Sequence, residues 1–238
     1  MTQFRLGGSE GTAVTGDLPS GILKVLHAEI ASGRWPRGTK IPTWSELAGE
    51  LKVGRSTIRE AVSTLVHLGM LRPQRGAGTI VSARSAISGV LTTLSDQYDT
   101  EELLVAQRSL EVEVCRQAAL RRSDADLAIL TELCKASALR DCRHPVSGRF
   151  HAALLEIART PLLTDLSEGI EARLRASGGV VPNRPGRPCP VDRQHRAIVV
   201  AIAAGDSEAA AAAAAAHARV ASQEPHLRLA EPRAGLGG

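Results

Sequence analysis

The chain has 238 residues, which allows two modest domains, and its 29 Lys and Arg against 25 Asp and Glu leave a mild net charge of +4. No apolar run is long enough to span a bilayer, which takes about 20 residues, and the N-terminus lacks the basic-then-apolar layout of a secretion signal, so we expect a cytoplasmic protein without membrane contact. Aromatic residues make up only 2% of the chain, which argues against nucleic-acid binding by stacking of bases on aromatic side chains.

The first predicted element is a helix over residues 20–32. Its inner face carries Ile22, Leu23, Leu26 and Ile30 at helical spacing. Residues 1–18 before it are rich in Gly and Thr and show no periodicity, so we expect them to be disordered.

A short second helix follows, because Thr43 is a candidate N-cap and Glu46 stands at the capping-box position three residues later. Residues 52–54 close this helix, and we expect Gly54 to take the left-handed conformation of a helix-ending turn. The next helix runs from about residue 55 to 68. Its inner stripe is Ile58, Ala61, Val62 and Leu65.

A second face of this helix carries Arg55 and Arg59, which lie one turn apart. Arginine is the side chain best shaped to bind guanine O6 and N7 bidentately. Ser56 and Thr57 lie in the first turn, where hydroxyls and free backbone N–H groups suit phosphate contact. The helix therefore has the composition of one that enters the DNA major groove.

A small hairpin is predicted after Gly69, with strands over residues 70–72 and 79–81. Its tip is glycine-rich and basic, so Arg75 can enter the minor groove and the backbone can approach the phosphates. The order helix, helix, turn, helix and hairpin is typical of a winged helix-turn-helix. The alternative is a small α/β fragment with solvated surface arginines, but order, spacing and basic tip agree on the DNA reader.

The charge distribution favours the same interpretation. Residues 19–84 contain 10 Lys and Arg and 4 Asp and Glu, whereas the segments on either side each have a net charge of −1. All the excess positive charge therefore lies in the predicted DNA-binding domain, where phosphates have to be neutralised.

Four segments in this region resemble the DNA-binding domain of the GntR superfamily of bacterial regulators: residues 33–42, 45–48, 53–61 and 75–79. The resemblance covers about residues 19–82. The family's usual Glu-Arg is replaced here by Trp44-Ser45, so a relative's operator sequence does not carry over. The resemblance and the pattern together give these candidate DNA contacts: Thr43, Ser45, Arg55, Ser56, Thr57, Arg59, Arg75, Gly76 and Gly78.

The rest of the chain is predicted to be mostly helical. Residues 83–99 read as a partly helical linker, residues 100–223 as an antiparallel helical bundle, and residues 224–238 as a flexible tail. Residues 176–190 are too rich in Gly and Pro to be helical, and the run 209–216 has very strong helix propensity. The four cysteines, Cys115, Cys134, Cys142 and Cys189, show no Cys-x-x-Cys pairing and are expected to be reduced thiols.

Three histidines, His151, His195 and His217, fall on different predicted helices of this bundle. A lone helical histidine is more often a surface or core residue than a ligand, but three on separate helices can converge on a cation. An alternative function is a three-histidine metal-dependent enzyme fused to a DNA-targeting module, with Asp192 as its nearest candidate base. The chain has neither His-Glu-x-x-His nor a nucleophile elbow, which argues against that alternative.

Segments 108–111, 149–151, 194–198, 201–206 and 216–217 resemble the ligand-binding FCD domain of the FadR subfamily, over about residues 100–222. The resemblance implies a divalent metal on the three histidines and an aspartate at position 147, where this chain has Ser147. A neutral three-histidine site suits Zn²⁺, Ni²⁺ or Mn²⁺, with water or effector in the open positions, and the rival is a metal-free polar pocket. The candidate effector-binding residues are Arg108, Ser147 and Thr160; the alternative for Arg108 is a surface pair with Glu111.

The expected protein is therefore mainly α, with an N-terminal winged helix-turn-helix and a C-terminal FCD-like bundle. We expect a homodimer that binds double-stranded operator DNA as a transcriptional repressor, and whose affinity for DNA changes when a small carboxylate binds in the bundle.

Overall fold

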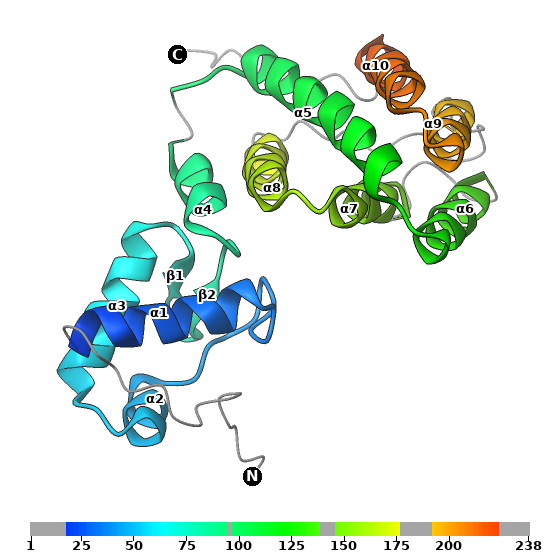
Figure 1. The fold of residues 1–238 in the computed structure, drawn as a ribbon. Coiled ribbons are helices and arrows are strands. Elements are labelled where there is room, and N and C mark those ends of the chain that lie inside the picture. Colours follow the sequence, from blue (N-terminus) through cyan, green and yellow to red (C-terminus); the bar gives the residue numbers. More distant parts are fainter. Residues whose placement is uncertain (1–17, 95–96, 139–145, 177–191, 224–238) are drawn as a thin grey trace, which may run out of the picture. The chain divides into compact units, whose positions relative to one another are not determined.

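The structure is a computed structural model that describes residues 18–94, 97–138, 146–176 and 192–223. Two compact units divide next to residue 95, and we call them the winged unit and the helical unit (Figure 1). The mainly α fold class is confirmed. The segments expected to be disordered or flexible lie outside the described residues, apart from position 18, which begins the first helix, and so does nearly all of the predicted loop over 176–190.

The winged unit consists of α1 (Leu18–Ala31), α2 (Trp44–Leu51), α3 (Arg55–His67), β1 (Leu71–Gln74), β2 (Gly78–Val81) and α4 (Ala86–Thr93). Its core joins the inner faces of the first three helices to the base of the hairpin. Fully buried members are Leu26, Ile30, Leu47, Ile58 and Leu65. The inner stripes predicted for α1 and α3 are therefore the ones that pack.

The hairpin is antiparallel, with Leu71 opposite Val81 and Gln74 opposite Gly78. A third segment joins it, which the sequence did not indicate: Lys40 bridges to Ile80. The Ile41 N–H donates to the Thr79 carbonyl at 3.0 Å, so the chain entering α2 is tied to the wing. This pairing fixes the wing against the helix-turn-helix.

The turn between α2 and α3 differs from the prediction. Lys52, rather than Gly54, takes the left-handed conformation, at φ 54° and ψ 42°. Its N–H donates to the Ala48 carbonyl, and α2 ends at Leu51, next to the predicted closing residues. Gly54 is extended, at φ −67° and ψ 148°, because it is the N-cap of α3, and its carbonyl accepts from the Thr57 and Ile58 N–H groups.

The helical unit consists of α5 (Thr100–Arg121), α6 (Asp124–Ala138), α7 (Val146–Ala158), α8 (Pro161–Ala176), α9 (Asp192–Ala204) and α10 (Ser207–Gln223). Figure 1 shows the long α5 running across this unit, and it packs against α7, α8, α9 and α10. The core is centred on Phe150, Ile198, Ile202 and Ala214. The small alanines of α10 let that helix approach α5 and α9 closely.

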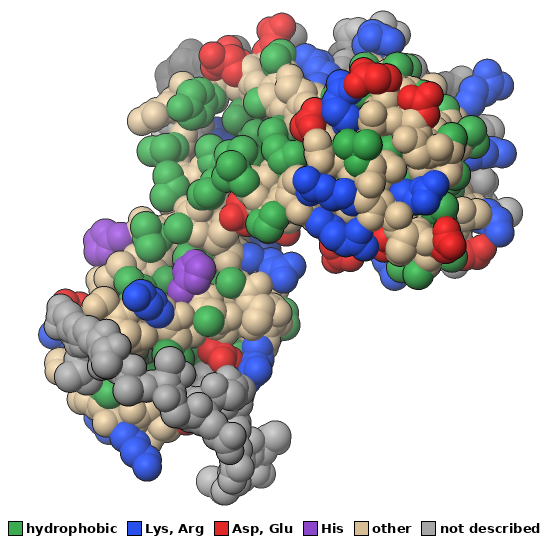
Figure 2. Space-filling view, in the orientation of Figure 1, with side chains coloured by type: hydrophobic (Ala, Val, Ile, Leu, Met, Phe, Trp, Pro, Cys, Tyr) green, Lys and Arg blue, Asp and Glu red, His purple; other side chains and the backbone are tan. Residues whose placement is uncertain are grey.

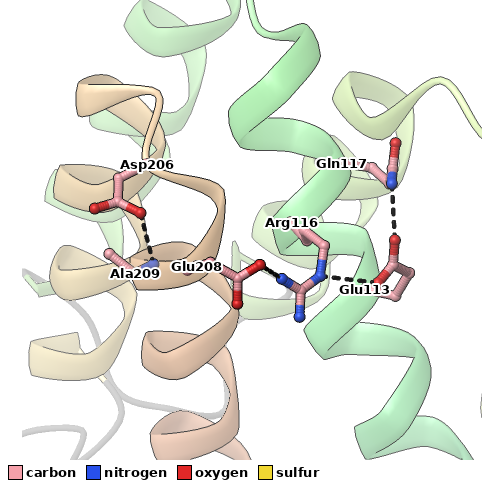
Figure 3. Close-up of polar contacts among 6 residues, drawn as sticks. All are labelled: Glu113, Arg116, Gln117, Asp206, Glu208 and Ala209. Atoms are coloured by element: carbon pink, nitrogen blue, oxygen red, sulfur yellow. Dashed lines mark hydrogen bonds and ion pairs between the residues drawn. The ribbon is translucent and has the colours of Figure 1, made fainter.

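Polar contacts fix the ends of these helices. Arg116 on α5 pairs with Glu208 on α10 and, at 3.1 Å, with Glu113 on its own helix (Figure 3). Arg122 donates to the Ile202 and Ala203 carbonyls at 3.1 and 2.8 Å, so it satisfies the free C-terminal carbonyls of α9. The exposed ion pair contributes little free energy, whereas the capped helix end holds α9 at a defined depth beside α5.

Figure 2 shows acidic and basic side chains side by side on the face of the helical unit that is in view. No helix in the described ranges is both long and apolar enough to cross a membrane.

Candidate DNA-reading face and histidine cluster

The outer face of α3 presents the predicted DNA-contacting side chains. Arg55, Ser56 and Arg59 are exposed and Thr57 is half-buried, while the opposite stripe lies in the core. Gly54 supplies no side-chain cap, so the first-turn N–H groups of α3 can receive a phosphate oxygen. The helix therefore offers two arginine forks together with a polar N-terminus.

The start of α2 has a structural task as well. Thr43 forms the predicted capping box: its hydroxyl accepts from the Glu46 N–H at 3.3 Å and donates to the Glu46 carboxylate at 2.7 Å. Hydrogen bonds from the Thr43 side chain and backbone hold the pKa of Glu46 below its usual value. Trp44 and Ser45 are exposed beside this cap.

The wing tip exposes both backbone and charge. Gly76 and Gly78 have φ values of 74° and 94°, a region that L side chains rarely adopt. A Cβ on Gly78 would lie 2.6 Å from Lys40 Cε, but that flexible side chain can move away, so the backbone conformation is what requires glycine there. Arg75 and Gly76 are exposed at the turn, which the Ala77 N–H closes by donating to the Gln74 carbonyl at 3.0 Å.

The helical unit brings the three predicted histidines together from α7, α9 and α10. One ligand atom from each of His151, His195 and His217 lies within 4.8 Å of the others. The ring centroids are 4.7 to 5.4 Å apart. His195 and His217 are buried and His151 is half-buried. Three separate helices therefore place their imidazoles at one point inside the bundle.

His195 is the most enclosed of the three. Phe150 stacks on its ring at a centroid distance of 4.2 Å. Among the described residues, neither of its ring nitrogens has a hydrogen-bond partner, and the same holds for Nδ1 of His217. A buried polar atom left without a partner costs about 1–3 kcal/mol of folding free energy. Binding of a ligand that contacts these nitrogens would therefore be favoured.

The electrostatics of the cluster favour the neutral form of His195 and His217. Burial, followed by the neighbouring charges of His151 and His217, lowers the pKa of His195 to about 2. Burial also lowers the pKa of His217; Glu111 opposes this and His151 adds to it. Neutral imidazole is the form that binds a metal, so these two side chains suit a divalent cation.

Glu111 also belongs to the cluster, although the sequence suggested it only as a surface partner for Arg108. Its Oε1 lies 3.1 Å from Nε2 of His151 and 3.4 Å from Nε2 of His217. Burial raises the pKa of Glu111, but the charge and hydrogen bond of His151 and the charge of His217 outweigh it, so the net shift is downward. The carboxylate is therefore ionised.

A signal for Glu111 does exist in the sequence. Position 111 is three and four residues before Val114 and Cys115, which are buried, so it shares the inner face of α5. A charged residue in an apolar stripe that faces three predicted histidine-bearing helices indicates a site rather than a solvated surface.

A small cavity of about 20 Å³ adjoins the cluster. Its polar lining is Gln107, Glu111, His151 and Ser167, and aliphatic side chains complete it. Gln107 Oε1 is buried, and within the described part of the chain it has no hydrogen-bond partner. The volume is that of roughly one water molecule, so a larger ligand requires the lining to move.

Neither Arg108 nor Thr160, two of the three candidate effector residues, lines the small cavity. Arg108 is half-buried and is not part of this lining; Gln107, its neighbour, is. Thr160 precedes α8 and also lies outside the lining, although its hydroxyl is buried without a partner among the described residues. Ser147 lies on α7 one turn before His151, and its side chain is outside the described part of the structure.

A larger, mostly apolar cavity of about 650 Å³ lies between α6 and α9. Its lining includes Cys134, Lys135, Arg196 and Val200, and none of the three histidines. Volume alone would favour this cavity as a ligand site. The small cavity has the stronger chemistry, because it borders the imidazoles that could hold a cation and contains an amide oxygen of Gln107 that has no partner in the described part of the chain.

Comparison with protein families gives two matches that together span most of the described chain. Residues 20–81 match the family of bacterial regulatory proteins called gntR, and residues 102–220 match the FCD domain. These two ranges coincide closely with the winged helix-turn-helix and the helical unit.

Individual relatives agree with this division. The chain is 30% identical over 198 residues to the putative L-lactate dehydrogenase operon regulatory protein of Escherichia coli, covering 77% of this chain and 76% of that protein. It is 27% identical over 167 residues to the galactonate operon transcriptional repressor of Escherichia coli, covering 65% and 73%. Among solved structures, a GntR protein of Streptococcus agalactiae superposes with a TM-score of 0.54 at 26% identity, covering 85% of this chain and 98% of that one.

Proposed function

Because the chain belongs to the GntR family of bacterial regulatory proteins and carries a C-terminal FCD domain, we propose that it is a homodimeric repressor whose affinity for operator DNA changes when a small carboxylate binds beside a metal ion in the helical unit. It is a ligand-responsive, DNA-binding transcriptional regulator and not an enzyme. The alternative of a three-histidine metalloenzyme is therefore set aside.

The observation that carries the proposal is the convergence of His151, His195 and His217. Three imidazole nitrogen donors can hold Zn²⁺, Ni²⁺ or Mn²⁺ while leaving positions open for water or a ligand oxygen. A carboxylate is the ligand class that suits such an open position, because it brings negative charge to a buried cation.

Two relatives support the same ligand class through their names. One is named for an L-lactate dehydrogenase operon and the other for a galactonate operon, and both lactate and galactonate are hydroxycarboxylates. The small cavity beside the cluster offers Gln107 and Ser167 as hydrogen-bonding partners for a hydroxyl or a second carboxylate oxygen.

The name of one relative supports repression, and the symmetry of paired half-sites supports a dimer. The galactonate relative is named a repressor. A single α3 spans one half-site, and two related half-sites require two copies of the chain related by a two-fold axis. Because the target is DNA, we expect the protein to act in the cytoplasm.

Mobility-shift titration with the DNA upstream of the protein's own gene tests the regulator. The double variant Arg55→Ala/Arg59→Ala should lose retardation, while Lys135→Ala, which removes one exposed positive charge from the helical unit, should retain it. Addition of hydroxycarboxylates should weaken the wild-type complex, and light scattering should give the mass of a dimer. A monomer, or retardation that no hydroxycarboxylate changes, contradicts the finer proposal.

The metal is tested by elemental analysis of protein purified without a histidine tag. We expect about one divalent ion per chain, its loss in His195→Ala, and its retention in His67→Ala, which removes an exposed histidine of α3. A metal content near zero in the wild type would favour the metal-free polar pocket.

The effector cavity is tested by comparing two variants. Gln107→Leu should abolish the thermal shift caused by an active hydroxycarboxylate, and Arg196→Ala, at the α6–α9 cavity, should leave it unchanged. The opposite pattern would move the effector to the larger cavity.

A further inference from the structure

We propose that Glu111 is the fourth ligand of the metal site, and that it supplies from α5 the negative charge that the three histidines lack. The inference rests on the metal site proposed above. It gives α5, the helix around which the unit is built, a direct part in metal binding.

The distances between the donor atoms carry the argument. Oε1 of Glu111 lies 3.1 Å from Nε2 of His151 and 3.4 Å from Nε2 of His217, and those two nitrogens lie 3.3 Å apart. Four ligands about 2.1 Å from a tetrahedral Zn²⁺ lie roughly 3.4 Å from one another. The three atoms therefore already form one face of a coordination tetrahedron.

The fourth corner belongs to His195. It is fully buried, and its ring nitrogens have no hydrogen-bond partner within the described ranges. Its ligand atom lies within 4.8 Å of those of the other two histidines, so a modest inward movement of the ring brings it into the same coordination shell, which Zn²⁺ can expand beyond four ligands to admit an effector oxygen. A purely hydrogen-bonded pocket would give partners to Glu111 and to Nε2 of His151 and His217, but it would leave both ring nitrogens of His195 without one.

Charge balance favours the carboxylate as a direct ligand. Three neutral imidazoles leave the full charge of a divalent ion uncompensated in a buried site, and burial of an unbalanced charge is costly. The side chain of Glu111 is only 13% exposed and its oxygen points at the two imidazole nitrogens. A bound Glu111 halves the net charge of the site.

The test uses the whole protein, stripped of metal and titrated with Zn²⁺, together with the visible spectrum of the Co²⁺ form. Glu111→Gln keeps the size of the side chain and removes its charge. Glu113→Gln is the matched control, because it makes the same change on α5 in a residue that contacts Arg116 and Gln117 instead of the histidines (Figure 3). Circular dichroism of the metal-free variants checks that each is folded.

We expect Glu111→Gln to weaken Zn²⁺ binding by at least about 100-fold and to shift the Co²⁺ absorption bands, since loss of even an outer-shell partner costs about 10–100-fold. Glu113→Gln should match the wild type in both measurements.

Two results would overturn the inference while leaving the metal site intact. One is wild-type Zn²⁺ affinity in Glu111→Gln. The other is a weaker affinity with an unchanged Co²⁺ spectrum, which would make Glu111 an outer partner that only orients the histidines. A wild type that binds neither ion would overturn the metal site and this ligand together.

Discussion

Gly89 in α4 and Gly69 at the end of α3 lie backbone against backbone. A Cβ built on Gly89 would lie 2.2 Å from the Leu68 carbonyl oxygen, and one built on Gly69 would lie 2.5 Å from the Gly89 carbonyl oxygen. Gly69 also has a φ of 69°. No side chain fits between these two segments, so α4 is held directly on the end of the DNA-reading helix.

Replacement of Gly89 by Ala should destabilise the winged unit. Alanine normally strengthens a helix, but here the contact is with backbone atoms that cannot rotate away, and overpacking of this kind costs about 1–3 kcal/mol. Both tryptophans of the chain, Trp35 and Trp44, lie in the winged unit, so their fluorescence during denaturant unfolding reports its stability.

The control for this change is Gly49→Ala in α2. A Cβ there meets nothing within 4 Å beyond its own helix in the described structure, so the substitution should raise stability by about 0.4–1 kcal/mol. An equal gain in Gly89→Ala would show that α4 is not held against α3.

The two arginines of α3 are expected to contribute separately to operator affinity. Arg55→Ala and Arg59→Ala should each cost about 1–3 kcal/mol of binding if each forms a bidentate base contact. Titration against a set of single-base operator variants checks this, because each substitution should also relax the preference at one position. A loss that is equal at every position would make the arginine a phosphate contact.

The wing should contribute through charge rather than base reading. Arg75→Ala is expected to reduce the slope of log K against log salt by about 0.9, the release of one counterion, without changing base preference. An unchanged slope would mean that the wing tip does not approach the DNA backbone.

Local signals in the sequence were sufficient for most of the fold. The N-cap Thr43 and the first-turn Pro161 predicted helix starts that agree with the observed ones. Such signals are local, because they depend on residues only a few positions apart. The prediction for the turn after α2 was wrong. Which of Lys52 and Gly54 takes the left-handed conformation depends on which residue also has to cap α3. That is decided by the joint geometry of two helices and not by the preference of one residue.

The histidine cluster was also predicted only in part, because one of its members depends on how distant helices pack. The three histidines share a type and could be connected from spacing and resemblance, whereas Glu111 joins them only because α5 packs against α7 and α10. The bridge from Lys40 to Ile80 is a non-local pairing of the same kind. Contacts between distant segments leave little trace in a single sequence.

A carboxylate introduced at position 147 tests how the site can be rebuilt. Position 147 is one turn before His151 on α7, which is the spacing that puts two residues on the same helix face. In the Glu111→Gln background, Ser147→Asp should recover at least about 10-fold of the lost Zn²⁺ affinity, since it returns one negative charge to the cluster. Zinc titration of the metal-free double variant is the measurement.

Ser147→Asn in the same background supplies the control, because it has the shape of the aspartate without its charge. In the otherwise unchanged chain, Ser147→Asp adds a second carboxylate to the cluster and should raise the affinity for Mn²⁺ more than that for Zn²⁺, since oxygen ligands suit the harder ion. Equal recovery by Asn and Asp would show that the cluster responds to the shape of the side chain at 147 and not to its charge. If neither variant recovers affinity, position 147 does not reach the ion, and α5 alone supplies the negative charge.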